Sequence, residues 1–337
     1  MRQIVCEAPD KLVLTEGVIP PCGEGEARVR IRRVGICGTD LHAYKGNQPF
    51  FSYPRILGHE LSGEIEQLGS DVQGLAVGDR VSVVPYLACG SCIACRKGKS
   101  NCCVSMQVLG VHLDGGLRES IVVPASQLLP ASDLTWDQAA MLEPLGIGAH
   151  AVRRSGLEAG DTALVIGAGP IGLGVMAMAR ERGARVIAMD LQAERLRFCQ
   201  SWAGVEATVA AGPDAAGELQ ALTGDAYPDV VFDATGHAGS MNGAFAYTSH
   251  GGTLVYVGLV KADISFHDPE FHKRELTLMG SRNATREDFE AVRRVIAKGD
   301  IDIERYITHR ADFGGMIDVF EDWLLPESGV IKAVVEL

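Results

Sequence analysis

The chain has 337 residues, of which 47% are hydrophobic and 22% are charged, and its formal net charge is −12. This length is sufficient for two domains, and the composition is that of a globular protein with a substantial core. The negative charge argues against nucleic acid or an anionic membrane surface as the main partner. The N-terminal residues lack the apolar segment of an export signal, so we expect a cytoplasmic protein.

The first part of the chain, up to about residue 130, is predicted to be rich in β-structure. Short apolar runs alternate with Gly, Pro and Asp, which is typical of strands joined by turns. A helical segment then begins near residue 135, with Asp133 or Thr135 as its N-cap, and continues towards Arg153. The expected strands are residues 27–34, 62–68, 80–84 and 119–123.

A glycine-rich segment in this first part contains a set of metal-ligand side chains. Cys37 is followed, after one further strand-like region, by His59 and Glu60. A thiolate, an imidazole and a carboxylate together suit zinc, and three protein ligands with one open position are typical of a catalytic zinc site. Taken alone, the same residues are about equally consistent with a buried free cysteine and a core histidine.

Five of the nine cysteines lie close together in the segment that follows. Cys89, Cys92 and Cys95 form two consecutive Cys-x-x-Cys steps, and Cys102 and Cys103 compete for the fourth position. In a reducing compartment this clustering indicates a metal rather than disulfides. Four thiolates close a tetrahedral structural zinc site, whose role is to hold a loop at about residues 86–104 that has little core of its own. A redox role or an iron–sulfur cluster is a weaker alternative.

The pattern changes near residue 160, where strands begin to alternate with helices. This β-α-β alternation predicts a parallel sheet covered by helices on both faces. The expected strands are 163–166, 185–189, 230–232, 252–257 and 276–279, and the expected helices are 170–183, 193–203, 215–222 and 239–248.

The first strand of this second part leads into a glycine loop that opens a helix. Gly167, Gly169 and Gly172 have the Gly-x-Gly-x-x-Gly spacing, with Pro170 and Ile171 between the last two. The first glycine makes the turn, the second admits a pyrophosphate, and the third lets the helix pack on the strand. The glycine spacing also favours this strand–turn–helix unit over a membrane span.

The next strand ends at Asp190, whose carboxylate is placed to accept hydrogen bonds from ribose hydroxyls and to repel a 2′-phosphate. This favours NAD over NADP, although Arg195 is a nearby cation that would tolerate the phosphate. Val257 and Gly258, after a later strand, are further candidates for cofactor binding.

The tail of the chain returns to a different pattern. An amphipathic helix is expected over residues 286–297, ended by Gly299, and strands are expected over 301–307 and 330–335. Because this tail is too short to fold alone, we expect it to complete the first domain. The expected domains are residues 1–149 with 283–337, and residues 150–282.

In the order of these motifs the chain resembles the zinc-dependent medium-chain dehydrogenases over essentially its whole length. The most specific match is Gly58-His59-Glu60-x-x-Gly63 followed by the four-cysteine lobe. The resemblance implies an α/β protein: a GroES-like β-rich catalytic domain with an inserted, doubly wound Rossmann domain. The branch with sorbitol, threonine and galactitol-1-phosphate dehydrogenases and the bacterial L-gulonate/L-galactonate 5-dehydrogenases is the most similar, and residues 108–116 and 280–284 look most like the last group.

The resemblance also implies roles for individual residues. Cys37 and His59 bind the catalytic zinc, Glu60 is a direct or near ligand, and Glu143 is either a further ligand or holds the zinc-bound water. Cys103 is favoured over Cys102 in the structural site, which gives two zinc ions per subunit. Thr39 and His42 resemble the family's proton relay. Arg282 matches an arginine near substrate and cofactor.

The residue after Arg282 is usually aromatic in the sorbitol dehydrogenases, and here it is Asn283. This departure disfavours a simple polyol, and an arginine in the pocket suits a carboxylate. We therefore expect an NAD-dependent dehydrogenase acting on a secondary alcohol of a sugar acid or polyol, as a homodimer or homotetramer. Phe50, Phe51 and Tyr53 are candidates for the pocket wall or for the core.

The alternatives are a sorbitol- or galactitol-1-phosphate-type polyol dehydrogenase, an L-threonine 3-dehydrogenase or a simple secondary-alcohol dehydrogenase. A zinc-stapled protein that binds nucleotide without turnover, and a zinc-free quinone reductase, are both disfavoured because the candidate metal ligands are all present.

Overall fold

The computed structural model describes residues 1–48 and 51–337, so that Phe50 lies outside the described residues. The chain divides into two compact units. Unit 1 comprises Met1–Glu143 together with Ile296–Leu337, and unit 2 comprises Pro144–Val295. The second unit is thus an insertion between two segments of the first, and its limits differ from the expected 150 and 282 by several residues.

Unit 1 is built mainly from antiparallel strands. Its largest sheet has the order β10-β6-β5-β3-β18-β17, and β9 also pairs with β3. A three-stranded sheet has the order β2-β1-β4, and β7 pairs with β8. The strands are β1 (Arg2–Ala8), β2 (Lys11–Glu16), β3 (Glu26–Ile36), β4 (Arg55–Ile56), β5 (Glu60–Leu68), β6 (Arg80–Val83), β7 (Tyr86–Leu87), β8 (Gln107–Val108), β9 (Ser120–Pro124), β10 (Leu128–Pro130), β17 (Ile307–Asp312) and β18 (Lys332–Glu336).

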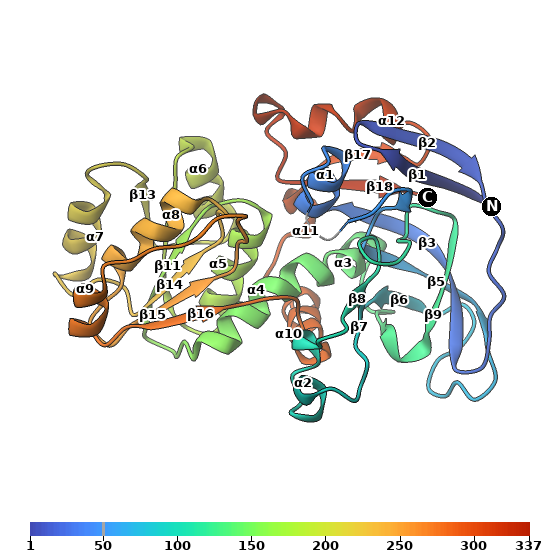
Figure 1. The fold of residues 1–337 in the computed structure, drawn as a ribbon, viewed down its shortest axis with the longest axis horizontal. Helices are drawn as coiled ribbons and strands as arrows, with labels where there is room; N and C mark the ends of the chain where they lie inside the picture. The colour runs from blue at the N-terminus through green and yellow to red at the C-terminus, as the bar shows by residue number, and fades with distance from the viewer. Residues whose placement is uncertain (49–50) are drawn as a thin grey trace. The chain divides into compact units, whose positions relative to one another are not determined.

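Strand β3 organises this sheet because it is long enough to serve three neighbours. Its first half pairs with β9, its second half pairs with β18, and β5 runs along its other edge. The tail of the chain therefore completes unit 1, and in Figure 1 the red β18 lies beside the blue β3. Val29 and Ile31 alternate into the core of unit 1, and Val34 is buried there after a register shift between Ile31 and Arg33; Phe51 and Tyr53 also pack against this core.

Unit 1 also contains several short helices. Thr135 is the N-cap of α3, where its hydroxyl accepts a hydrogen bond from the Gln138 N–H at 3.2 Å and the Gln138 side chain accepts one from the Thr135 N–H at 2.8 Å. This capping box is a start signal that the sequence carries locally. The helices are α1 (Gly38–Tyr44), α2 (Ile93–Arg96), α3 (Trp136–Ala140), α11 (Ile303–Tyr306) and α12 (Met316–Val319).

The prediction of a strand over residues 301–307 is wrong. The chain forms the helical turn α11 there, and β17 begins only at Ile307. The Asp302 carboxylate accepts a hydrogen bond from the Arg305 N–H at 3.1 Å, which caps the turn and outweighs the β-propensity of the isoleucines.

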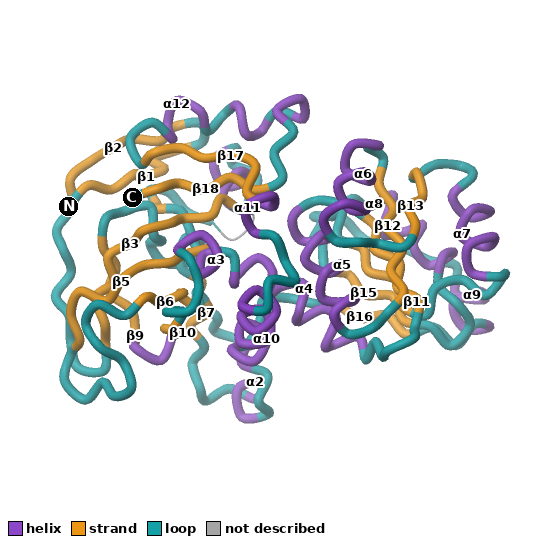
Figure 2. The backbone as a smooth tube through the Cα atoms, turned by 180° about the vertical axis from the view of Figure 1, so that it is seen from behind, coloured by secondary structure: helices purple, strands orange, loops and turns teal. Residues whose placement is uncertain are grey.

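Unit 2 is a six-stranded parallel sheet in the order β13-β12-β11-β14-β15-β16. Helices lie on both sides of its strands, as Figure 2 shows. The strands are β11 (Thr162–Ile166), β12 (Arg185–Asp190), β13 (Ala207–Ala210), β14 (Val230–Asp233), β15 (Thr253–Tyr256) and β16 (Thr277–Gly280). The helices are α4 (Leu142–Ser155, whose first two residues belong to unit 1), α5 (Pro170–Glu181), α6 (Ala193–Trp202), α7 (Ala215–Thr223), α8 (Ala238–Gly243), α9 (Asp268–Lys273) and α10 (Arg286–Ala297).

The strand order reverses beside β11, because β12 and β13 lie on one side of it and β14, β15 and β16 on the other. In doubly wound sheets, ligands bind at this switch point, outside the carboxyl ends of the strands. The predicted fold class is therefore confirmed. Over the described residues, no helix combines the length and the hydrophobicity that a membrane span requires.

Candidate active site and metal centres

Cys37 lies where β3 gives way to helix α1. It occupies the N-cap of α1, and its N–H donates to the Asp40 carboxylate at 2.9 Å. The other Asp40 oxygen accepts the N–H of Gly58 at 3.1 Å. Asp40 is fully buried, so a single carboxylate ties the Cys37 turn to the segment that leads into His59. Sequence analysis missed Asp40, although an acidic residue three positions after an N-cap is a recognisable signal.

His59 and Glu60 stand at the start of β5, next to Cys37. The candidate ligand atoms of Cys37, His59 and Glu60 all lie within 4.8 Å of one another. His59 is buried, and its Nδ1 has no hydrogen-bond partner and lies 3.7 Å from Asp40 Oδ1. Burial alone would lower the pKa of His59, but the charge of Asp40, together with contributions from Cys37 and Glu143, outweighs burial and raises that pKa well above its ordinary value. The structure thus brings three of the expected ligands together.

Glu143 is not one of the three grouped side chains. It lies in the first turn of α4, is 3% exposed, and accepts a short hydrogen bond from the Tyr86 hydroxyl. Burial raises the pKa of Glu143 to about 7, and the nearby Glu60 carboxylate adds to that shift. This arrangement favours Glu60 as the direct ligand and Glu143 as a carboxylate beside it. Tyr86 carried no signal in the sequence, because only the fold brings it to residue 143.

Thr39 and His42 both lie on α1, directly after Cys37. Thr39 is half-buried and His42 is exposed. The helix therefore leads from a partly buried cysteine to a histidine in contact with solvent.

The Cys37, His59 and Glu60 group fits zinc by the chemistry of its donors. One sulfur, one nitrogen and one oxygen are the ligand types that zinc accepts, and an unpartnered buried ring nitrogen is otherwise costly.

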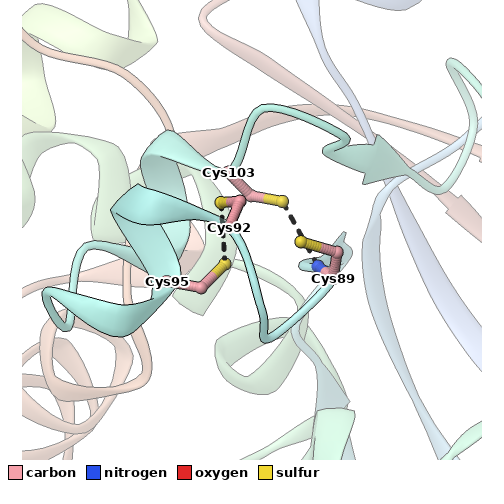
Figure 3. Close-up of side chains that lie close together, drawn as sticks. All are labelled: Cys89, Cys92, Cys95 and Cys103. Carbon is pink, nitrogen blue, oxygen red and sulfur yellow. Dashed lines mark hydrogen bonds between the residues drawn. The ribbon is translucent and has the colours of Figure 1, made fainter.

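The second group is the four-cysteine lobe, drawn in Figure 3. The sulfur atoms of Cys89, Cys92, Cys95 and Cys103 lie within 4.8 Å of one another. Cys102 is exposed and is not part of the group. Backbone N–H groups of Ser91 and Cys92 lower the pKa of Cys89 to about 6, which favours the thiolate that a metal needs. None of the residues of helix α2 in this lobe is buried, so a bound metal, rather than a hydrophobic core, would stabilise the lobe.

The glycine loop lies between β11 and α5, at the switch point of the parallel sheet. Gly167 has a φ of +96°, a conformation that a residue with a side chain rarely adopts. A Cβ on Gly172 would lie 1.8 Å from the Gly167 carbonyl oxygen, so the close packing of helix on strand requires glycine there. A Cβ on Gly169 would meet only Arg195 Nη1, at 3.8 Å, which leaves the open face that a pyrophosphate needs.

The other cofactor candidates follow the carboxyl ends of neighbouring strands. Pro170 occupies the first turn of α5, followed by Ile171, and Asp190 ends β12. One Asp190 oxygen accepts the N–H of Ala168 at 2.7 Å, and the other accepts the N–H of Gln192 at 2.8 Å. The carboxylate therefore braces the glycine loop from the side where a ribose would lie.

Two pairs of candidates lie further along the same edge of the sheet. The N–H groups of Val257 and Gly258 both donate to the Asp233 carbonyl at 2.9 Å, just after β15. Arg282 is exposed and Asn283, with a φ of +54°, is half-buried, in the loop between β16 and α10. Because parallel strands share one carboxyl edge, all these candidates belong to the same side of unit 2.

Comparison with known proteins agrees with this architecture. Residues 23–133 match the model of the alcohol dehydrogenase GroES-like domain, and residues 170–298 match that of the zinc-binding dehydrogenases. The chain is 44% identical to the L-galactonate-5-dehydrogenase of Escherichia coli K12 over 335 residues, which are 99% of this chain and 98% of the relative. The chain belongs to the zinc-binding alcohol dehydrogenase family, as its motifs indicated, and it is an oxidoreductase.

Two solved structures are similar over the whole chain. The alcohol dehydrogenase RspB of Escherichia coli CFT073, complexed with NADH, superposes with a TM-score of 0.93 at 33% identity and covers 100% of this chain and 99% of that one. A zinc-binding dehydrogenase of Sinorhizobium meliloti 1021, bound to NADP, has a TM-score of 0.90 at 30% identity with the same coverage of both chains. The expected zinc and nicotinamide cofactors are those of the family.

Proposed function

We propose that the protein oxidises a secondary hydroxyl of a sugar acid related to L-galactonate or L-gulonate and transfers the hydride to NAD. The observation that carries this proposal is the group formed by Cys37, His59 and Glu60 in a chain that also has the glycine loop. A catalytic zinc set and a nicotinamide site in one chain are the two parts that alcohol oxidation requires. The 44% identity to an L-galactonate-5-dehydrogenase supports the substrate class.

The catalytic residues act on the substrate hydroxyl. Cys37, His59 and Glu60 would hold the catalytic zinc, with Glu143 beside it. When bound, zinc lowers the pKa of a hydroxyl that reaches it, so that the alcohol loses its proton near neutral pH. Thr39 and His42 would carry this proton to solvent along α1, since imidazole is suited to proton transfer near neutral pH and His42 is exposed. Cys89, Cys92, Cys95 and Cys103 would hold a second, structural zinc.

The cofactor residues favour NAD. Asp190 would accept hydrogen bonds from the adenosine ribose, and its charge disfavours a 2′-phosphate. Arg195, whose guanidinium lies near Gly169, weakens this preference because its positive charge would tolerate a 2′-phosphate. Because solved relatives hold either NADH or NADP, the preference is tested by comparing kcat/KM for the two cofactors, with NAD expected to be the better one.

The substrate residues are the part of the proposal that depends most on resemblance. Arg282 would pair with the substrate carboxylate, and Asn283 replaces the aromatic residue of the sorbitol dehydrogenases. The exposed edge strand β16, with Leu278 38% exposed, is a natural surface for pairing with a second copy in a homodimer or homotetramer. The clustered thiols are suited to a reducing compartment, which supports the cytoplasm.

The test is NADH formation from a panel of L-galactonate, L-gulonate, sorbitol, galactitol 1-phosphate and L-threonine, with the enzyme and with Cys37→Ser. We expect activity on a sugar acid in the enzyme and a loss of at least 100-fold in the variant, because the variant removes the thiolate ligand. Equal rates in both proteins would refute the catalytic zinc. Activity on neutral polyols or threonine alone would keep the mechanism and refute the substrate.

A further inference from the structure

A buried lysine, Lys332, faces the candidate catalytic metal group and has no part in the function proposed above. Its side chain is 2% exposed. The ammonium donates to three acceptors: the Ile36 carbonyl oxygen at 3.0 Å, Glu60 Oε1 at 2.6 Å and Glu60 Oε2 at 2.9 Å. An ammonium has three N–H donors, so all of them are committed. The ion pair with Glu60 compensates the buried ammonium.

The position of Lys332 joins the two strands that carry the metal ligands. Lys332 begins β18, which pairs with the end of β3, and its acceptor Ile36 directly precedes Cys37. Its other acceptor, Glu60, begins β5 opposite Gly35. A Cβ on Gly35 would lie 2.0 Å from Glu60 Oε2, so the carboxylate lies over a residue that has no side chain. Lys332 therefore fixes the orientation of the Glu60 carboxylate, and Gly35 leaves the space that the carboxylate occupies.

The charges around Glu60 explain what this contact does. Glu60 is fully buried, and the Cys37 sulfur and the buried Glu143 side chain lie near it. A carboxylate with no cation nearby would bind a metal strongly, since burial makes an unpaired charge costly. Because both of its oxygens accept hydrogen bonds from Lys332, the negative charge of Glu60 is already compensated before a metal binds. Its attraction to the metal is correspondingly reduced.

We propose that Lys332 is a positioning residue that weakens Glu60 as a zinc ligand, so that the position Glu60 occupies on the metal can be given up to the substrate. This inference rests on the proposed function, because it assumes that Cys37, His59 and Glu60 hold zinc. A merely structural lysine would make the opposite prediction, since its loss would disorder the ligands and loosen the metal.

The experiment measures the release of the catalytic zinc to a chelator, in the intact protein, for Lys332→Met. We expect release to be at least about tenfold slower than in the wild type, because Glu60 has lost its partner and its uncompensated carboxylate binds the metal more tightly. We also expect kcat to fall while KM for NAD stays the same. Lys332→Arg should restore both values. Lys11→Met removes an exposed lysine paired with Glu7, and serves as the control for net charge.

A second background tests whether the effect passes through Glu60. In Glu60→Gln, the further change Lys332→Met should slow zinc release much less than it does in the wild type. An equal effect in both backgrounds would show that Lys332 acts on the metal by charge alone, and would overturn the proposal. So would release from folded Lys332→Met that is unchanged or faster. If that variant does not fold, Lys332→Gln, which keeps a donor for Glu60, is measured in both backgrounds.

The failure of the proposed function has a different signature. A wild-type protein that holds only the zinc of the four-cysteine lobe would refute the catalytic site itself. A protein that shows the expected zinc release but oxidises none of the tested alcohols would refute the proposed substrate and leave the role of Lys332 intact.

Discussion

The substitution Gly35→Ala tests the geometry of the metal group most directly. The new methyl group would lie 2.0 Å from Glu60 Oε2, 2.8 Å from Met141 Cε and 2.9 Å from Glu60 Cβ. The backbone of Gly35 is in an ordinary strand and has no positive φ, so the substitution introduces no conformational strain. The effect therefore comes from crowding, and it falls on a carboxylate that Lys332 holds by both oxygens.

The magnitude follows from two contributions. Overpacking a close contact in a core costs about 1–3 kcal/mol. Breaking a buried ion pair costs about 3–5 kcal/mol, and a displacement of Glu60 breaks this pair only in part. We expect the free energy of unfolding of unit 1 to fall by about 2–4 kcal/mol, and the zinc held by Cys37, His59 and Glu60 to be lost or weakened.

The assay is urea unfolding followed by tryptophan fluorescence, together with the zinc content. Trp136 and Trp323 belong to unit 1 and Trp202 belongs to unit 2, so a variant that keeps only Trp136 and Trp323 isolates the relevant transition. Gly38→Ala is the matched control, because a Cβ there meets nothing within 4 Å and its φ is not positive. A Gly35→Ala protein within about 0.5 kcal/mol of the control, with two zinc ions bound, would refute the described packing of Glu60.

Three further outcomes are expected. Cys92→Ser should reduce the zinc content from two ions to one. It should also make the lobe at residues 86–104 sensitive to proteolysis, because no residue of α2 is buried in a core that could order the lobe without the metal. An unchanged zinc content would contradict this prediction. Tyr86→Phe should lower kcat by about 10- to 100-fold and leave KM for NAD unchanged, since the buried Glu143 loses its donor; normal kcat would show that the hydrogen bond has no catalytic role. Burial alone would raise the pKa of Asp288, but hydrogen bonds from His150, Arg153 and Thr285 together have the larger effect and lower that pKa. The stability that the ionised Asp288 contributes is therefore fully present above the unfolded pKa of about 3.9 and is lost as the pH falls through the folded pKa. Asp288→Asn should therefore lower the melting temperature more at pH 7 than at pH 3, while part of the decrease persists at pH 3 because the folded pKa lies lower still; a larger decrease at pH 3 would argue against this account.

The sequence was most informative where a residue's role depends on its immediate neighbours. Thr135, one of the two N-caps predicted, caps α3 and forms a capping box with Gln138 three positions later, and the helix 286–297 was predicted with the limits that α10 has. The glycine loop was predicted for the same reason, since a strand, a turn and a helix follow one another without interruption.

The prediction failed where the relevant partner is distant in the chain or where a local hydrogen bond overrides propensity. Lys332 contacts Glu60 across 272 residues of sequence, and nothing near residue 332 indicates a buried cation. Tyr86 and Glu143 are similarly separated. The strand expected at residues 301–307 was wrong because Asp302 caps a turn there, an effect that a pattern of apolar residues does not contain. The roles of Arg282 and Asn283 remain a prediction.

The return of β18 to β3 has a consequence for the order in which the molecule is assembled during synthesis. Unit 2 is one continuous segment, Pro144–Val295, and all its strands are available before residue 296 leaves the ribosome. The metal-ligand residues Cys37, His59 and Glu60 of unit 1 are synthesised early. Lys332, whose ammonium compensates the charge of Glu60, is synthesised only after the whole of unit 2. A nascent chain therefore presents an uncompensated anionic metal group for most of its synthesis, and a zinc ion captured at that stage would be held by a tighter carboxylate than the finished protein provides.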